Sequence, residues 1–589
     1  MKKTRRFASL ATAAILAACA VVPATMSALP VSAADNNAIT ITDADGATHA
    51  YEAYQIFTGN YSGNVLNDIQ WGSGVDGNAV LTELKTTAAF EVGGNNLFKD
   101  CATAEDVADV LGSTTGENER VFADDEVLAK AFAKVVGNHL TATKSGTGSA
   151  SGVTGLSDGY YLVQDSAAPT NNGGNNSGAM TRYIVKVVGG GDTVELTAKH
   201  SAPSVIKKVQ ENTKAVTATG QAFAGNANYA VGEKYNDVAD YNMGDSVSFK
   251  LYGTLPDTYD DYDHYFYQFT DTLATGLTLN VDGGTKANAL DEGDFTVKIG
   301  DTTVTSGYTV AASGNGFTLT FEDLKDSNAT NVTATKSSVI TVEYTATLNQ
   351  NAVVGLDGNE NAVKLTYSNN PNSTKGGKND TNGETPEDKV VVFTYALDVT
   401  KYLGSKDKTA DATEGTQAGF KLYNADKSKV ANLDSNNKIT GWVATSEGAG
   451  TAGTEVKTTA DGKFGFIGLD DGVYTLVETT VPAGYNKMAD QTVVISATTK
   501  NDQAWTGKAS DALTALTLKH STVENADVVY SATDADKFGT VKDEIINKAG
   551  STLPSTGGIG TTIFYVAGGV LVVGAGVLLI TKKRAKDAQ

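Results

Sequence analysis

An uncharged apolar run near the C-terminus, from Ile559 to Ile580, constrains this chain most strongly. A run of this length crosses a bilayer as an α-helix. The basic cluster at residues 582–584 is typical of the cytoplasmic end of such a helix. We therefore expect a transmembrane helix and a basic tail at residues 558–589, with the bulk of the chain on the other side of the membrane.

The N-terminus also predicts export. Residues 1–6 include four basic side chains, residues 7–22 are apolar and rich in alanine, and residues 31–34 are small enough for signal peptidase. We interpret residues 1–34 as a signal peptide. An alternative is a lipobox at residues 16–19, Leu-Ala-Ala-Cys, which would attach a lipid to its cysteine.

Composition limits the mature chain further. Cys101 is the single cysteine outside the predicted signal peptide, so an intramolecular disulfide is excluded. A net charge of −22 argues against binding to nucleic acid or to anionic surfaces. The length between the two ends exceeds what one hydrophobic core supports and indicates about three or four domains.

The first of these domains, at residues 35–200, has a mixed pattern. Branched, alternating segments at its two ends predict strands, and two segments between them have helical spacing. The helices are expected to begin near Thr103 and Asp124 and to end near Gly112 and Gly137. We expect a β-domain with inserted helices.

The rest of the exported region predicts β-structure alone. Short alternating segments separated by Gly, Asn and Asp clusters fill residues 201–389 and 390–548, with a polar linker at 368–388 and a long strand at 390–402. Short strands with regular turn signals favour immunoglobulin-like β-sandwiches. The expected fold is mainly β, with tandem sandwich domains.

An internal repeat links the first and third domains. Residues 155–165 align without gaps with residues 468–478, and each segment is a glycine-bounded turn that leads into a strand. The last aligned position is a carboxylate in both, Asp165 in the first domain and Glu478 in the third. The two domains are expected to share an architecture.

A short motif stands just before the apolar run: Leu553, Pro554, Ser555, Thr556 and Gly557. It resembles the LPXTG sorting signal of Gram-positive surface proteins. The resemblance implies that sortase, a membrane transpeptidase, cuts after Thr556, holds its carbonyl as a thioester and transfers it to an amine. Residues 549–557 are then a spacer and sorting signal, with a precursor in the plasma membrane and a product on the cell wall.

The third domain carries a second resemblance. Lys401 in its first strand, the stretch 474–485 around Glu478, and Asn547 in its last strand resemble a CnaB-type domain. The match is to the last domain of sortase-assembled shaft pilins. It implies a Cna-type sandwich in which Lys401 and Asn547 form an isopeptide bond and Glu478 is the catalytic proton shuttle.

Such a reaction needs these three residue types for physical reasons. Burial lowers the pKa of a lysine, which frees its amine, and raises the pKa of a carboxyl, which can then carry protons. Strand pairing holds the amine against the carboxamide, and positioning of this kind lowers a barrier by roughly 7–11 kcal/mol. Ammonia leaves, so the reaction occurs once in each chain.

The middle domain offers a similar set. Its first strand and the stretches around Asp271 and Asn361 resemble the second domain of the same pilins, which implies that Asp271 is the catalytic acid. Strand alternation turns Lys207 inward and leaves Lys208 in solvent. Asn361 is the expected acceptor for an isopeptide bond, and Asn369, which has the same parity, is the alternative.

The first domain lacks such a set. No lysine occurs at residues 35–50, where its first strand is expected, so no crosslink is predicted and Asp165 is interpreted as structural. Shaft pilins of the resembling family expose a lysine at the end of this domain, usually after proline. Lys199 stands at that place, behind Ala198, and is the expected polymerisation lysine.

Two acidic clusters, at residues 260–264 and 434–438, are interpreted as solvated turns. Neither has the ligand spacing of a metal loop, and aspartate and asparagine are common in turns. No metal and no cofactor are therefore expected.

Taken with the resemblance, these features predict the major structural subunit of a sortase-polymerised fimbria. Each subunit would join Thr556 to Lys199 of a neighbouring subunit, which gives a covalent homopolymer linked to peptidoglycan that supports adhesion. The alternative is a monomeric wall-anchored adhesin or minor pilin that binds a host protein or glycan. No catalytic triad, metal set or carboxylate pair indicates an enzyme with turnover.

Overall fold

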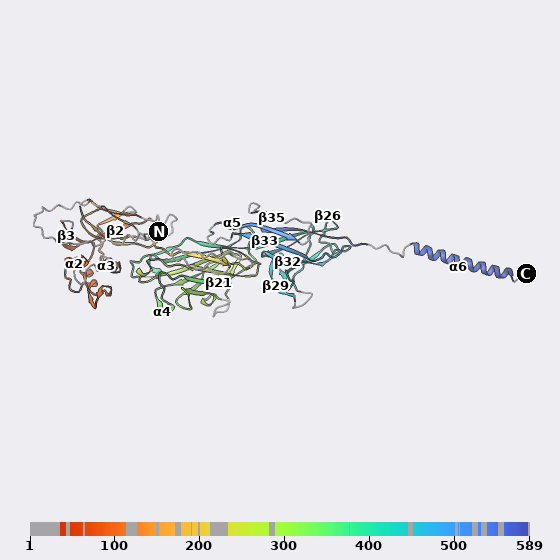
Figure 1. Cartoon of the computed structure of the whole chain (residues 1–589), viewed down its shortest axis with the longest axis horizontal. Helices are drawn as coiled ribbons and strands as arrows, with labels where there is room; N and C mark the ends of the chain where they lie inside the picture. Colours follow the sequence, from red (N-terminus) through yellow and green to blue (C-terminus); the bar gives the residue numbers. More distant parts are fainter. Residues whose placement is uncertain are drawn as a thin grey trace, which may run out of the picture.

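The computed structural model describes most of the exported chain and the C-terminal helix. The described residues are 36–42, 48–62, 65–112, 126–148, 152–170, 178–189, 191, 193–197, 201–212, 234–281, 289–375, 377–445, 452–500, 505, 507–520, 528–531, 539–551 and 559–586. The predicted signal peptide, Lys199 and the motif at 553–557 lie outside them. Three β-rich domains follow one another in a row and lead to one long helix at the C-terminus (Figure 1).

The first domain combines two sheets with helices. Its elements are β1 (Asn37–Thr42), β2 (Tyr51–Ser62), β3 (Val65–Trp71), α1 (Gly77–Leu84), β4 (Glu91–Val92), β5 (Asn95–Asn96), α2 (Ala104–Gly112), α3 (Glu126–Asn138), β6 (Gly146–Gly148), β7 (Val153–Leu156), β8 (Gly159–Asp165), β9 (Arg182–Val187) and β10 (Thr193–Thr197). The larger sheet has the order β3-β2-β8-β9 with β6 on β2, and the smaller has the order β10-β1-β7. Helices cover one face of the larger sheet, around Phe57 and Leu162, and the smaller sheet covers the other, around Ala53 and Val163.

Local sequence accounts for these helices. Asp76 caps α1, since its carboxylate accepts a hydrogen bond from a first-turn main-chain N–H at 3.1 Å. At the start of α2, Thr103 and Asp106 bond reciprocally to each other's main chain, which forms a capping box. α3 runs one residue past its expected stop at Gly137. That glycine makes room for the Arg182 guanidinium, which a Cβ there would meet at 2.3 Å.

The middle domain is a sandwich of two sheets around one large core. Its elements are β11 (Val205–Gln210), β12 (Tyr235–Asn236), β13 (Val238–Asp240), β14 (Ser246–Gly253), β15 (Tyr267–Leu273), β16 (Leu277–Leu279), β17 (Thr296–Ile299), β18 (Thr302–Val304), β19 (Thr309–Ala312), β20 (Gly316–Phe321), α4 (Ser327–Thr330), β21 (Ile340–Leu348), β22 (Asn359–Ser368), β23 (Asn382–Glu384) and β24 (Asp388–Phe393). One sheet has the order β12-β11-β14-β21-β17-β18 with β16 on β21, and the other has the order β13-β24-β22-β15-β20-β19 with β23 on β22. The expected sandwich is confirmed.

The third domain is a second sandwich. Its elements are β25 (Tyr395–Leu403), β26 (Ser405–Thr409), β27 (Gly419–Asn424), β28 (Lys429–Leu433), β29 (Ile439–Ala444), β30 (Val456–Lys457), β31 (Lys463–Leu469), β32 (Gly472–Thr480), β33 (Gln491–Thr499), α5 (Ala509–Ala512), β34 (Leu513–His520), β35 (Val528–Ser531) and β36 (Thr540–Asn547). The smaller sheet is β26-β25-β31 with β36 on β25, and the larger is β29-β28-β27-β32-β33-β34-β35 with β30 on β27. The core lies between the two sheets.

The strand expected at residues 390–402 is two strands, which corrects the sequence prediction. The chain leaves the middle domain in β24 and enters the third in β25, with Thr394 between them. β24 is apolar on both faces, because Val392 packs in the middle core and Phe393 packs in the third. The apolar pattern therefore continues from β24 into β25 and gives no sign of the break between the two strands. The segment expected as a linker supplies β23 and the start of β24.

The first and middle domains meet through charged side chains. Lys130 of α3 lies 3.0 Å from both carboxylate oxygens of Asp261, and Lys134 Nζ lies 2.5 Å from Asp263 Oδ1. The acidic turn at 260–264 was expected to be solvated, and it instead faces α3 while staying partly exposed. These pairs form the charged part of the first junction, where Met180 N–H also donates a hydrogen bond of 2.7 Å to Asn369 O.

The C-terminal helix α6 (Ile559–Lys586) stands apart from the three domains in Figure 1. Within it, Thr562–Arg584 is long and apolar enough to cross a membrane, and none of that stretch is buried against the rest of the chain. The expected transmembrane helix is confirmed in length and composition.

Candidate functional site

The buried lysine of the third domain lies on β25, between two neighbouring strands. β25 pairs antiparallel with β31 and parallel with β36, so Lys401 lies opposite Ile545 and Leu403 lies opposite Asn547. Alternate side chains from Val399 to Leu403 point into the core, and Lys401 is buried with them. The first and last strands of the domain thus hold an amine and a carboxamide side by side.

Three side chains meet at this place. Lys401 Nζ lies 2.5 Å from Asn547 Oδ1, and Asn547 Nδ2 donates a hydrogen bond of 2.7 Å to Glu478 Oε1. Lys401 Nζ and Glu478 Oε1 are 3.9 Å apart, and all three residues are 0% exposed. The other oxygen of Glu478 accepts a hydrogen bond of 2.8 Å from Met488 N, which fixes the carboxyl group.

The surroundings of this trio favour an uncharged amine. Lys401 Nζ lies 5.7 Å from the centre of the Phe420 ring, which stacks on Phe464 at 4.1 Å, and 3.4 Å from Met488 Sδ. Burial lowers the Lys401 pKa to about 8, against the opposing charge of Glu478. At neutral pH roughly one amine in ten is then unprotonated, far more than for a lysine in water. The site therefore combines a nucleophile, an amide carbonyl and a proton carrier.

A related set lies in the core of the middle domain. Lys207 on β11 contacts the Asp271 carboxylate on β15 across the sandwich and donates a hydrogen bond of 2.8 Å to Tyr344 Oη. The Tyr344 hydroxyl in turn donates to Asp271 Oδ1 at 2.8 Å and accepts from Asn361 Nδ2 at 2.9 Å. Lys207, Asp271 and Asn361 are each 0% exposed, and the structure brings them together.

Electrostatics in the middle set resemble those in the third domain. Burial lowers the Lys207 pKa to about 8 and raises the pKa of Asp271, while each charge opposes the shift of the other. Within the described part of the chain, Asn361 Oδ1 has no hydrogen-bond partner. The sequence did not single out Tyr344, although its parity with inward Val342 on β21 would have indicated a buried hydroxyl.

Two sequence alternatives have clear places in the structure. Lys208 is 1% exposed rather than solvated, because the third domain covers its face of β11; it contacts Asp237, which also accepts a hydrogen bond from Trp505 N. Asn369 is buried one residue beyond β22, eight positions from Asn361. That separation is roughly 26 Å along a strand, so Asn369 lies far from the middle-domain lysine.

The first domain holds a different set at the aligned carboxylate. Asp165 Oδ1 lies 2.7 Å from His49 Nδ1, and its Oδ2 accepts hydrogen bonds from Thr181 N and Oγ1 at 2.6 and 2.8 Å. The repeated turns adopt the same backbone conformation, with φ of 75° at Gly155 and 92° at Gly468. Both domains thus share the turn. In the first domain, however, the side chain beside the carboxylate is that of His49.

Three family models match the chain. The Cna-B-like domain of Gram-positive pilin backbone subunit 2 matches residues 243–371, a prealbumin-like fold domain matches 405–509, and the LPXTG cell wall anchor motif matches 545–587. The chain therefore contains domains similar to those of Gram-positive backbone pilins. The two domain matches fall on the two sandwiches that hold the buried lysine sets, and the anchor match covers the C-terminal helix.

Relatives of this chain are distant in sequence. The trypsin-resistant surface T6 protein of Streptococcus pyogenes serotype M6 is 26% identical over 396 residues, which cover 58% of this chain and 65% of that relative's length. The solved T6 backbone pilin is 18% identical, with coverage of 88% of this chain and 100% of that chain and a TM-score of 0.45. The major pilin SpaD of Corynebacterium diphtheriae is 16% identical, with coverage of 88% and 98% and a TM-score of 0.41.

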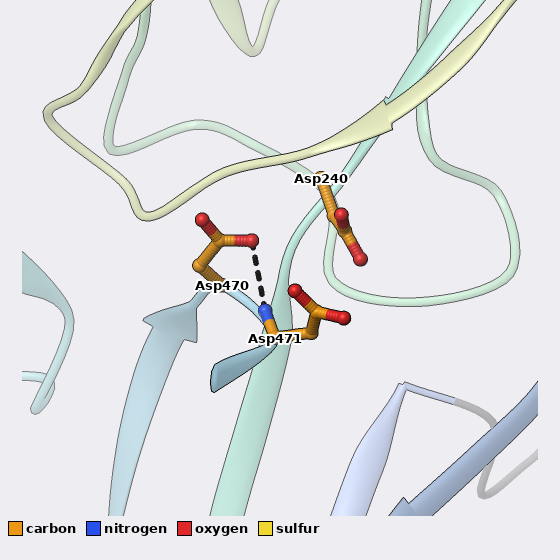
Figure 2. Close-up of side chains that lie close together, drawn as sticks. All are labelled: Asp240, Asp470 and Asp471. Carbon is orange, nitrogen blue, oxygen red and sulfur yellow. Dashed lines mark hydrogen bonds between the residues drawn. The ribbon is translucent and has the colours of Figure 1, made fainter. Parts of the chain in front are cut away.

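The chain also carries a carboxylate cluster that sequence reasoning missed. Asp240 ends β13, and Asp470 and Asp471 form the turn before β32; one oxygen from each lies within 4.8 Å of the others (Figure 2). Asp471 N donates a hydrogen bond of 2.8 Å to Asp470 Oδ1, and Tyr395 Oη donates to Asp240 Oδ2 at 2.9 Å. Burial, together with the charge of Asp240, raises the pKa of Asp470. These residues lie on different domains, and no local pattern joins them.

Proposed function

We propose that this chain is the major structural subunit of a covalent, sortase-polymerised fimbria attached to the Gram-positive cell wall. The pilin backbone and cell wall anchor matches support this function. The observation that carries it is the Lys401–Asn547–Glu478 arrangement, in which the first and last strands of a domain meet at a reactive pair. A bond between those strands suits a subunit that is pulled at both ends.

In the third domain, we assign an isopeptide bond between Lys401 and Asn547. The neutral Lys401 amine attacks Cγ of Asn547, and the Glu478 carboxyl group takes a proton from the attacking nitrogen and passes it to Nδ2 of Asn547, to which its Oε1 is hydrogen-bonded. The Cγ–Nδ2 bond then breaks, and the nitrogen leaves as ammonia. The product is an amide between Nζ and Cγ, and Glu478 is restored.

In the middle domain, we assign the corresponding bond between Lys207 and Asn361, with Asp271 as the proton carrier. The hydroxyl of Tyr344 bridges Asp271 and the Asn361 amide, and it holds the carboxamide in place. Among the described residues the Asn361 oxygen has no hydrogen-bond partner, so it can receive a proton as the amine attacks. Both reactions run once per chain, so the protein is a self-processing structural subunit and not an enzyme with turnover.

Between subunits, we assign a bond from Thr556 of one chain to Lys199 of the next, made by sortase. The last subunit is linked to peptidoglycan through the same Thr556 carbonyl, and the fibre supports adhesion to a host surface. In the order of the chain, Lys199 follows β10 and precedes β11, between the first two domains.

Immunoblotting of cell-wall extracts tests the polymer. A ladder of high-mass bands is expected from the natural chain, and Lys199→Ala should reduce it to a single band. Lys85→Ala, which alters another exposed lysine of the first domain, is the matched control and should leave the ladder intact. A single band from the natural chain would instead indicate a monomeric wall-anchored adhesin or a minor pilin.

A further inference from the structure

A second buried lysine lies beside Lys207 and faces the opposite way, toward the third domain. β11 and β12 pair with Val209 opposite Asn236, so Lys208 and Asp237 are the next opposed positions. The two side chains are in contact, and they are 1% and 2% exposed. This pair plays no part in the two isopeptide sites.

The Asp237 carboxylate is held at both of its oxygens. Oδ1 contacts Lys208 Nζ, and Oδ2 accepts a hydrogen bond of 2.8 Å from Trp505 N of the third domain. A main-chain N–H at that oxygen stabilises negative charge that develops there when a nucleophile attacks the carbon. The amine and the oxyanion donor thus lie on the two oxygens of one carboxyl group.

A second acid lies close to this pair. Asp388, at the start of β24, accepts a hydrogen bond of 2.7 Å from the main chain of Lys207, directly beside Lys208. Its charge adds to the effect of burial, which raises the pKa of Asp237 to about 6, and the pKa of Asp388 itself is raised by burial. Two carboxyl groups whose affinity for protons is raised by burial therefore lie close to one amine.

Burial of the charged Lys208–Asp237 pair costs desolvation free energy, whereas an amide between the same two side chains carries no charge. We propose that Lys208 and Asp237 condense into a third intramolecular amide bond. Lys208 passes a proton to Asp388, and its amine attacks Cγ of Asp237 while Trp505 N–H holds the charge on Oδ2. Asp388 returns this proton to Oδ1 and then carries a second proton there from the attacking nitrogen, so the C–Oδ1 bond breaks and Oδ1 leaves as water. One ammonium and one carboxylate give one amide and one water, with no other reactant.

The two domains must be docked for this reaction, because Trp505 belongs to the third domain and Lys208 to the middle one. The bond would fasten the first strand of the middle domain to the segment that leads into β13, at the face where the third domain sits. It is therefore chemically distinct from the two lysine–asparagine bonds. Its leaving group is water, and theirs is ammonia.

Peptide mapping of the whole exported chain by mass spectrometry tests the bond. Peptides that contain Lys208 and Asp237 should be recovered joined and lighter than their sum by one water. Asp237→Asn should replace the loss of water by a loss of ammonia. Lys208→Arg should leave the two peptides separate, and the control Lys250→Arg, on the partly exposed face of the next strand, should leave them joined.

The natural chain alone tests the proposal, so the result does not depend on whether a variant folds. Separate, unmodified peptides containing Lys208 and Asp237 overturn it. Full joining in Asp388→Asn overturns the role given to Asp388. Neither result bears on the lysine–asparagine bonds or on the polymer, which are read from ammonia loss and from the band ladder.

Discussion

Replacing Glu478 by glutamine should stop bond formation in the third domain. The glutamine keeps the size of the side chain and its place beside Met488 N, but it can no longer carry a proton from Lys401 to the leaving amide nitrogen. The bond would close a loop of 146 residues between Lys401 and Asn547. The entropy that such a crosslink removes from the unfolded chain corresponds to about 5 kcal/mol. For a domain of this size, that lowers Tm by roughly 10–20 °C.

Two measurements on the exported chain test this reasoning. Intact mass should show one ammonia fewer lost in Glu478→Gln than in the natural chain, and calorimetry should place the unfolding of its third domain at a lower temperature. Glu455→Gln is a suitable control, because Glu455 binds Thr479 and Thr480 on the same strand but lies at the surface. An unchanged ammonia loss in Glu478→Gln would refute the role of this glutamate as proton carrier.

Three further predictions concern the other sites. Asp271→Asn should remove the ammonia loss of the middle domain alone, as read from peptide mapping; a persisting joined peptide would contradict it. In Glu478→Gln the unreacted Lys401 keeps a folded-state pKa of about 8 or lower against 10.5 in the unfolded chain, so the unfolded state binds more protons between these values and stability should rise with pH across that window. Urea unfolding at both ends of the window measures this, and a flat profile would argue against a buried amine. Asp261→Asn should weaken the first junction by only ~0.2–1 kcal/mol, because its pair with Lys130 is partly exposed; limited proteolysis should show slightly faster cleavage between the domains, and a large loss of stability would be the contrary result.

Strand alternation predicted that Lys207 faces inward, whereas Lys401 was assigned from the resemblance of the third domain; one physical reason explains the burial of both. Lys401 and Lys207 lie at positions whose neighbours two residues away are apolar, so their side chains had to enter the cores. The same rule gave the wrong environment for Lys208. Alternation assigns a side chain to one face of a strand, but it does not say that another domain covers that face.

Other features depended on contacts that no local pattern encodes. The break at Thr394 was hidden because β24 is shared by two cores and is apolar on both faces. The Asp240, Asp470 and Asp471 cluster arises from two separate domains that dock. Tyr344, by contrast, could have been predicted from the sequence, because its position on β21 has the same parity as inward-facing Val342.

The two junctions between the domains of this chain are stabilised by different kinds of contact. The middle and third domains share β24 and bury carboxylates between them, whereas the first domain is held to the middle one in part by Lys130 and Lys134 on partly exposed acids. Salt screens the second kind of contact far more than the first. A fibre of such subunits should therefore bend more readily at the first junction than at the second, and its persistence length should shorten as ionic strength rises.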